Sequence, residues 1–373
     1  MSGRVRITRK DLRVGMTVPW DILDLEGRKL LAKGQTLRSE QMLDQLCQYV
    51  LFHNIPEVVH NAQKASQGKV NVFDKGHDYL VRIERIFNEL EEKNPDCVDK
   101  INNLAKDILN LCAKEPDAVL AAVHLNQDLT YVYFHPLQCA YLSVLIARRA
   151  GFTDVECYSL AAAAILANVG MRYTQDKLYA QQDPVTDAQQ KIIKQHCNKS
   201  VDMLREVGFN NEDVLSIIAE HHERCDGSGY PNALKRDDIC RGALVLAVTD
   251  RYSAMISGRA YRPPSSVKDS LQHLFMDKGH HYEVQFSLLL IKELTVFPPG
   301  CFVKLTNGET AIVVYRGKMS PMEPFLKSVL GQNGEQYANP LVRDLSVHKF
   351  EIETICPYES DKPLNYGKIW GYV

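Results

Sequence analysis

The hydrophobic and polar positions of this 373-residue chain follow a period of two near its beginning. From Val5 to Leu31 apolar and polar residues alternate, with breaks at Gly15 and Gly27, which predicts short strands joined by turns. Ser39 is placed to start a helix. The apolar face of that helix carries Met42, Leu43 and Leu46. Residues 1–60 therefore predict a small α+β module, either a sensor or docking domain or a lid on the rest of the chain.

A helical period begins after a polar segment, 61–70, in which Ser66 and Gly68 indicate a linker. Two amphipathic helices are predicted before residue 117, with Pro95 and Pro116 as breaks. Their apolar positions are Leu80, Ile83, Phe87 and Leu90 in the first, and Val98, Ile101, Leu104, Ile108 and Leu111 in the second. These faces in region 61–116 could form a homodimer interface, but covering the core of the next domain is the more common use.

The pattern stays helical from Asp117 to Phe297 and changes after Pro298-Pro299-Gly300. There Asn307-Gly308 separates two alternating runs, which predicts a hairpin with a type I′ turn. The fold class is therefore mainly α. A helical domain at 117–297 carries a small N-terminal α+β module and a small C-terminal β extension at 298–373.

Bulk composition changes this picture little. The net charge is −2, so no global field attracts nucleic acid or an anionic membrane, and any phosphate binding must be local. The most apolar run, Leu160–Val169, is shorter than the roughly 18 residues that span a bilayer. The ten cysteines show no C-x-x-C pair and no signal peptide precedes them, which is typical of reduced thiols in a cytoplasmic protein.

The candidate chemistry centres on His221–Pro231, which reads H-H-E-R-C-D-G-S-G-Y-P. Two adjacent imidazoles can bind a metal, and a Gly-Ser-Gly turn lets the backbone approach a ligand closely. Together they indicate a site for a metal and a phosphate. The alternative is a surface loop with two solvated histidines.

This stretch resembles the signature of the HD-GYP family, a branch of the HD phosphohydrolases that opens cyclic di-GMP at a centre of two or three metals. The resemblance extends over about 117–297 and includes Arg259-Ala260-Tyr261-Arg262, which is similar to the family's R-P-Y-R element. It implies an all-helical HD bundle.

The chain departs from the family at the His-Asp pair of the segment H-D-I-G-K. Here the corresponding residues are Ala167-Asn168-Val169-Gly170-Met171. Ala167 and Met171 supply no ligand for a hard metal, and the amide of Asn168 is a weaker donor than the carboxylate that bridges two metals. Tyr131 also stands where some members carry a ligand Glu. The resemblance therefore implies a degenerate member that lacks a bridged metal pair.

Five other positions match the family's metal ligands. They are His135, His196, His221, His222 and Asp250. Three imidazoles, from His196, His221 and His222, could hold one divalent cation such as iron, manganese or zinc. Alternatively, no metal binds and these histidines form hydrogen bonds in a polar pocket. Asp250 would then need a partner, either Arg251 or a ring N–H.

The resemblance also implies a ligand-binding set. Arg259 and Arg262 match cationic positions for the dinucleotide phosphates, because guanidinium groups pair with phosphate oxygens. Gly229 and Tyr230 keep the signature loop, where the Tyr ring could contact a base. Two positions differ, since Gln181 stands near a frequent phosphate-binding Lys and Ser253 replaces a frequent Asp. Without the motif, the arginines would be ordinary surface charges.

Three functional hypotheses follow. The first is a non-catalytic protein that binds cyclic di-GMP or a related cyclic dinucleotide and signals through its flanking modules to an unidentified protein partner. The second is a slow phosphodiesterase with one metal at His196, His221 and His222. The third is a protein-interaction scaffold that keeps only a relic of the motif.

Overall fold

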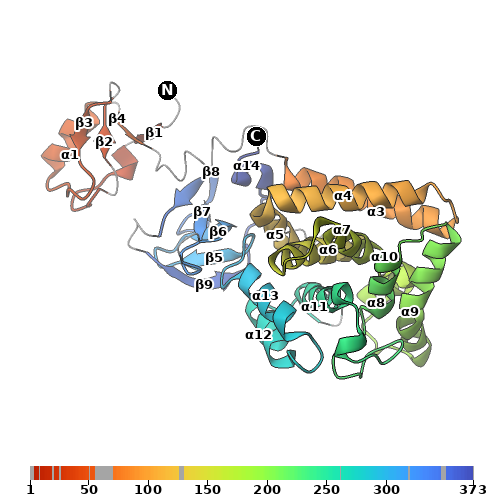
Figure 1. Ribbon diagram of the computed structural model, residues 1–373. Coiled ribbons are helices and arrows are strands. Elements are labelled where there is room, and N and C mark those ends of the chain that lie inside the picture. Colours follow the sequence, from red (N-terminus) through yellow and green to blue (C-terminus); the bar gives the residue numbers. More distant parts are fainter. Residues whose placement is uncertain are drawn as a thin grey trace. The chain divides into compact units, whose positions relative to one another are not determined.

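The computed structural model describes residues 4–7, 9–18, 21–24, 27–49, 51–54, 70–125, 130–260, 262–317, 320–345 and 350–372. The chain forms two compact units (Figure 1). The first contains Met1–Lys69, Arg343–Glu351 and Gly371–Val373, and the second contains Val70–Val342 and Ile352–Trp370. Most of the predicted linker, 61–69, lies outside the described residues.

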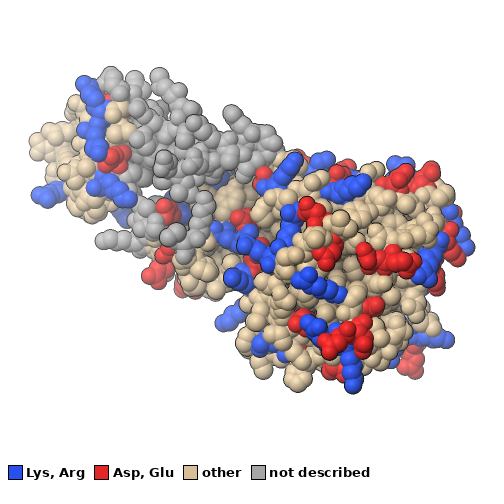
Figure 2. Space-filling view, viewed as in Figure 1, with Lys and Arg blue, Asp and Glu red and all other residues tan. Residues whose placement is uncertain are grey.

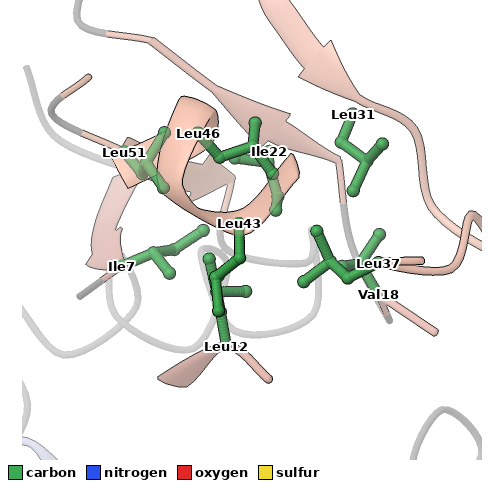
Figure 3. Close-up of a cluster of buried hydrophobic side chains, with 9 residues drawn as sticks. All are labelled: Ile7, Leu12, Val18, Ile22, Leu31, Leu37, Leu43, Leu46 and Leu51. Carbon is green, nitrogen blue, oxygen red and sulfur yellow. The ribbon is translucent and has the colours of Figure 1, made fainter. Parts of the chain in front are cut away.

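The first unit confirms the small α+β module. Its four-stranded antiparallel sheet has the order β1-β4-β2-β3. The strands are β1 (Arg4–Ile7), β2 (Ile22–Leu23), β3 (Lys29–Leu31) and β4 (Leu51–Asn54). Helix α1 (Glu40–Cys47) begins where predicted, because the Ser39 side chain accepts a hydrogen bond from the Met42 amide at 3.2 Å. Leu43 and Leu46 of α1 join seven other buried apolar side chains in the core (Figure 3).

The two helices expected before residue 117 are α3 (Val72–Glu91) and α4 (Cys97–Lys114). Ile83 and Phe87 of α3, and Ile101 and Ile108 of α4, are fully buried within the chain. Both helices contact α6 (Tyr131–Arg149), and α4 also contacts α7 (Asp154–Leu166). Their apolar faces therefore cover the core of the helical unit.

Helices α6 and α7 form the centre of the helical unit (Figure 1). Thr153 and Glu156 form a capping box at the start of α7, whose Ala-rich sequence allows close packing on all sides. The other helices are α5 (Pro116–Leu125), α8 (Arg172–Ala180), α9 (Asp187–Glu206), α10 (Glu212–Glu220), α11 (Arg241–Ile256), α12 (Val267–Asp277) and α13 (Val284–Leu294). None of the helices in the described part of the chain is long and apolar enough to cross a membrane.

The C-terminal extension is a five-stranded sheet of order β8-β7-β6-β5-β9. Its strands are β5 (Phe302–Leu305), β6 (Thr310–Tyr315), β7 (Phe325–Leu330), β8 (Gln336–Arg343) and β9 (Ile352–Cys356), followed by the short helix α14 (Tyr366–Trp370). Gly300 allows the sheet to approach α5, because a Cβ there would lie 2.7 Å from the Ala121 carbonyl oxygen. The sheet and the helices thus belong to one compact unit.

The hairpin predicted at Asn307-Gly308 is present, but the predicted type I′ turn was wrong. Gly308 has a φ of +84°, whereas Asn307 is not among the described residues with positive φ. The Leu305 amide donates to the Glu309 carbonyl at 2.9 Å, which leaves a three-residue loop. This is the pattern of a type I turn followed by a left-handed glycine, which needs one positive φ rather than two. The Asn307 side chain accepts from the Glu309 amide at 3.1 Å instead.

An ion cluster joins the sheet to three helices. Arg316, just after β6, pairs with Asp117 of α5 and Glu293 of α13. Arg149 of α6 also pairs with Glu293 at 3.0 Å. On the outer surface, Figure 2 shows Lys and Arg side chains interspersed with Asp and Glu, in keeping with a net charge near zero.

Candidate functional site

A cavity of about 160 Å³ opens among α6, α8, α9, α11 and the loop after α10. It is lined by Tyr131, His135, Asn168, Met171, Gln175, Leu178, Tyr179, Ile193, His222, Tyr230, Asp250, Ala254 and Arg259. Residues from both predicted sets, the metal ligands and the ligand-binding groups, therefore meet in one place.

His135 of α6 and Asp250 of α11 form one half of the site. His135 Nε2 lies 2.9 Å from Asp250 Oδ1, so a ring N–H, not Arg251, is the partner of this carboxylate. Burial by itself lowers the pKa of His135, but Cys139, Tyr131 and the Asp250 carboxylate outweigh it and raise that pKa well above the usual value. Burial likewise opposes ionisation of Asp250, yet His135 holds the pKa of that carboxyl well below its usual range. Both pKa shifts favour an ion pair over two neutral groups.

His196 of α9 and His221 at the end of α10 form the other half. Their Nε2 atoms are 3.4 Å apart. Each Nδ1–H donates to a carbonyl three residues earlier, at 2.6 Å to Ile193 and 2.7 Å to Ile218. These bonds direct the Nε2 lone pairs toward each other, with Cys197 Sγ 3.7 Å from His196 Nε2. A histidine whose Nδ1–H is donated in this way can bind a metal through Nε2.

Burial keeps this half of the site neutral. It lowers the pKa of His196 to about 3, and it also lowers the pKa values of His221 and His222. The His222 ring lies beside both neighbours, 4.1 Å from His221 and 5.0 Å from His196 between ring centroids. Neutral imidazoles are the form that binds a metal.

The spacing of the His196 and His221 Nε2 atoms fits one shared cation. Two nitrogens bound tetrahedrally to zinc, at about 2.0–2.1 Å each, would lie about 3.4 Å apart, close to the separation of the His196 and His221 Nε2 atoms. Two groups of described residues bring enough donors together for a metal. They are His196, Cys197 and His221, and His135, Cys139 and Asp250. Cys139 was not predicted as a ligand from the sequence, although it follows His135 by four residues on one helical face.

The segment 167–171, which was predicted to correspond to the family's H-D-I-G-K segment, is held tightly. Gly170 packs against α9, where a Cβ would lie 2.7 Å from the His196 carbonyl oxygen. Ser200 Oγ accepts from the Gly170 amide and donates to the Ala167 carbonyl, both at 2.9 Å. This places Asn168 at the cavity with 3% of its surface exposed. Its Oδ1 is buried and has no hydrogen-bond partner among the described residues.

The two predicted phosphate-binding arginines occupy different surroundings. Arg259 lines the cavity, and its guanidinium lies 5.8 Å from the Tyr131 ring centroid and 3.4 Å from the Tyr131 hydroxyl. Arg262 Nη2 donates to the Ala254 carbonyl at 2.9 Å, near the end of α11, and is not among the residues that line the cavity. Tyr261 lies outside the described residues.

Two other predicted positions lie away from the cavity lining. Gln181 donates to the Asp183 and Pro184 carbonyls and exchanges hydrogen bonds with Gln189, so it braces the start of α9. Ser253 is fully buried in α11.

Aromatic rings form one wall of the cavity. Tyr131 stacks on His135 and Tyr179, with ring centroids 5.0 Å and 4.7 Å apart. Tyr179 and Gln175 lie one turn apart on α8, and both line the cavity. These two residues were not predicted from the sequence, because no motif marks them. Their only signal was the four-residue spacing of an aromatic and an amide.

The signature loop is held by Glu223, for which the sequence predicted no role. Glu223, 2% exposed, accepts from the amides of Asn232 at 2.6 Å and Leu234 at 2.9 Å. Gly229 packs on the backbone of this residue, since a Cβ would lie 2.5 Å from the Glu223 Cα. Tyr230 is thereby positioned with its ring centroid 4.8 Å from that of His222.

A family model described as an HD domain matches residues 117–285. A cyclic di-GMP phosphodiesterase of Pseudomonas aeruginosa is 25% identical over 73% of this chain, and the match spans 63% of that relative. A cyclic di-GMP phosphodiesterase of Thermotoga maritima is 32% identical over 43% of this chain and 45% of its own length. The chain thus spans less than two thirds of these relatives.

Two further comparisons concern another relative and a solved structure. A 3'3'-cGAMP-specific phosphodiesterase of Vibrio cholerae is 28% identical over 41% of this chain and 29% of its own length. The solved structure of an HDG"Y"P protein from Bdellovibrio bacteriovorus superposes with a TM-score of 0.53 at 16% identity, covering 78% of this chain and 99% of that one. This likeness confirms the predicted helical fold.

Proposed function

Because residues 117–285 belong to the HD domain family, we propose that this HD domain binds cyclic di-GMP, or a related cyclic dinucleotide, without hydrolysing it. One observation carries the proposal. Asn168 lies at the cavity where the family places a bridging carboxylate, and its buried Oδ1 has no partner among the described residues. A two-metal hydrolase needs a carboxylate there to join its metals.

The remaining groups support ligand binding. Arg259 offers a guanidinium for a phosphate, and the Tyr131–Tyr179 wall offers stacked rings next to it. The cavity is smaller than the roughly 300–1,000 Å³ of a pocket that encloses a drug-sized ligand. It would therefore enclose a phosphodiester portion of the dinucleotide, with the rest lying outside.

The His196–His221 pair would hold one divalent cation, with His222 nearby. For hydrolysis, that cation would supply positive charge to a phosphate oxygen. The second candidate, a slow phosphodiesterase, rests on this pair. We favour a receptor because Asp250 is already hydrogen-bonded to His135 and no carboxylate stands at residue 168.

Calorimetric titration of the full chain with cyclic di-GMP, in manganese, tests the proposal. We expect heat that saturates near a single ligand per chain and at least a tenfold loss of affinity in Arg259→Ala. Arg251→Ala is the matched control, since it removes an exposed charge that does not line the cavity. Heat that continues after each injection would indicate turnover. Absence of heat would favour a scaffold, and an Arg259→Ala variant that binds as tightly as wild type would contradict a phosphate-binding role for Arg259.

A gain-of-function variant tests why hydrolysis would be absent. Ala167→His combined with Asn168→Asp restores the two missing ligand types. We expect turnover to rise sharply in manganese, and no gain would contradict our explanation.

A further inference from the structure

Two amide side chains at the cavity have buried oxygens without a hydrogen-bond partner among the described residues. Asn168 is 3% exposed and Gln175 is 7% exposed. Asn168 Oδ1 and Gln175 Oε1 are both buried without a partner. Buried polar groups in folded proteins are nearly always hydrogen-bonded, so this pair indicates a ligand that completes them.

The two amides reach the cavity from different elements. Asn168 lies between α7 and α8, where Ser200 fixes the backbone on either side of it. Gln175 projects from α8, one turn before Tyr179. Both line the cavity that Arg259 also lines. Two amides and one guanidinium therefore surround the same space.

The charges around this space favour an anion. Asp250 is the only carboxylate among the lining residues, and it is hydrogen-bonded to His135. A carboxamide turned by 180° presents its NH₂ in place of its oxygen with the same shape, so Asn168 and Gln175 can each donate to a phosphate oxygen. A carboxylate at either position would repel that phosphate unless a cation lay between them.

We propose that Asn168, Gln175 and Arg259 form a metal-independent seat for a phosphodiester group of the cyclic dinucleotide. This inference rests on the proposed function and adds how the ligand is held. Amide and guanidinium donors take the place of metal coordination. An amide at residue 168 in place of a carboxylate would then strengthen phosphate binding and prevent hydrolysis.

The test is equilibrium binding of cyclic di-GMP to the full chain, either in EDTA or in manganese. We expect the wild-type dissociation constant to agree within about threefold between the two conditions. Gln175→Glu, which preserves shape, should weaken binding by about tenfold or more in EDTA, because a donor to a charged group becomes a repelling charge. Asn168→Asp should weaken it similarly in EDTA and recover in manganese.

Gln190→Leu is the matched control, because it removes an exposed amide of α9 away from the cavity lining. Unfolding by urea checks that each variant is folded, and Gln175→Leu replaces Gln175→Glu if the charge prevents folding. Wild-type binding that requires manganese would overturn this inference but leave the proposed function intact. Unchanged affinity in the Gln175 variants would also overturn it. Absence of binding in both conditions would overturn the proposed function itself.

Discussion

Substituting Glu223 by Gln should loosen the loop that carries Tyr230. The carboxylate accepts two backbone N–H groups, from Asn232 at 2.6 Å and from Leu234 at 2.9 Å, and it is 2% exposed. A glutamine of the same shape has one oxygen and one NH₂, so one of these N–H groups would face another donor.

The expected loss in free energy of unfolding follows from these two hydrogen bonds. A hydrogen bond to a charged group contributes about 1.5–3 kcal/mol, and a buried N–H left without a partner costs about 1–3 kcal/mol. These terms overlap, so we expect Glu223→Gln to lower the free energy of unfolding by about 2–4 kcal/mol. Because Tyr230 lies beside His222, the affinity for the dinucleotide should fall as well.

Urea unfolding, followed by circular dichroism, measures this loss. Glu220→Gln is the matched control, since Glu220 accepts one backbone amide, from Cys240, and a glutamine oxygen can keep that bond. We expect the control to lose less than about 1 kcal/mol. A Glu223→Gln variant as stable as the control would refute the reasoning.

Three further predictions concern stability. Burial lowers the pKa of His124 to about 4, against the opposing effect of the Leu120 and Pro299 carbonyls. The unfolded chain then binds the extra proton first, so the free energy of unfolding should fall as pH drops from about 6.5 to 4. His124→Gln should reduce this fall, which is measured by comparing unfolding near pH 7 and near pH 5. Arg316→Met should lower the free energy of unfolding of the helical unit by about 3–5 kcal/mol in urea, because the two partly buried carboxylates of Asp117 and Glu293 lose this partner. Adding Asp117→Asn should recover part of the loss. Gly170→Ala should cost about 1–3 kcal/mol, since its Cβ would meet the His196 carbonyl at 2.7 Å, and a thermal melt unchanged from wild type would contradict this.

The hydrophobic pattern was sufficient to predict the N-terminal α+β module, the two helices before residue 117 and the first hairpin of the C-terminal sheet. Ser39 caps α1 as expected, and Ile83 and Ile101 face the core, because local spacing determines which helical face is apolar. The turn at Gly308 was wrong in type, since loop length depends on the register of β5 and β6 as well as on the Asn-Gly pair.

The site was harder to predict, because side-chain direction depends on packing between distant segments. Arg259 and Arg262 look equivalent in the motif, yet a tight loop turns one into the cavity and the other toward the end of α11. Gln175 and Tyr179 line the cavity because α8 packs beside α6, a contact that the local sequence pattern does not predict. The assignment of roles to these residues stays a prediction.

The most direct test of the central claim is the fate of the ligand itself. Purified protein is incubated with cyclic di-GMP and manganese, separated from free ligand by gel filtration, and the bound nucleotide is released and identified by chromatography. We predict that cyclic di-GMP is retained by the protein and recovered intact. Recovery of linear dinucleotide or mononucleotide in its place would contradict the claim that this HD domain binds without hydrolysing.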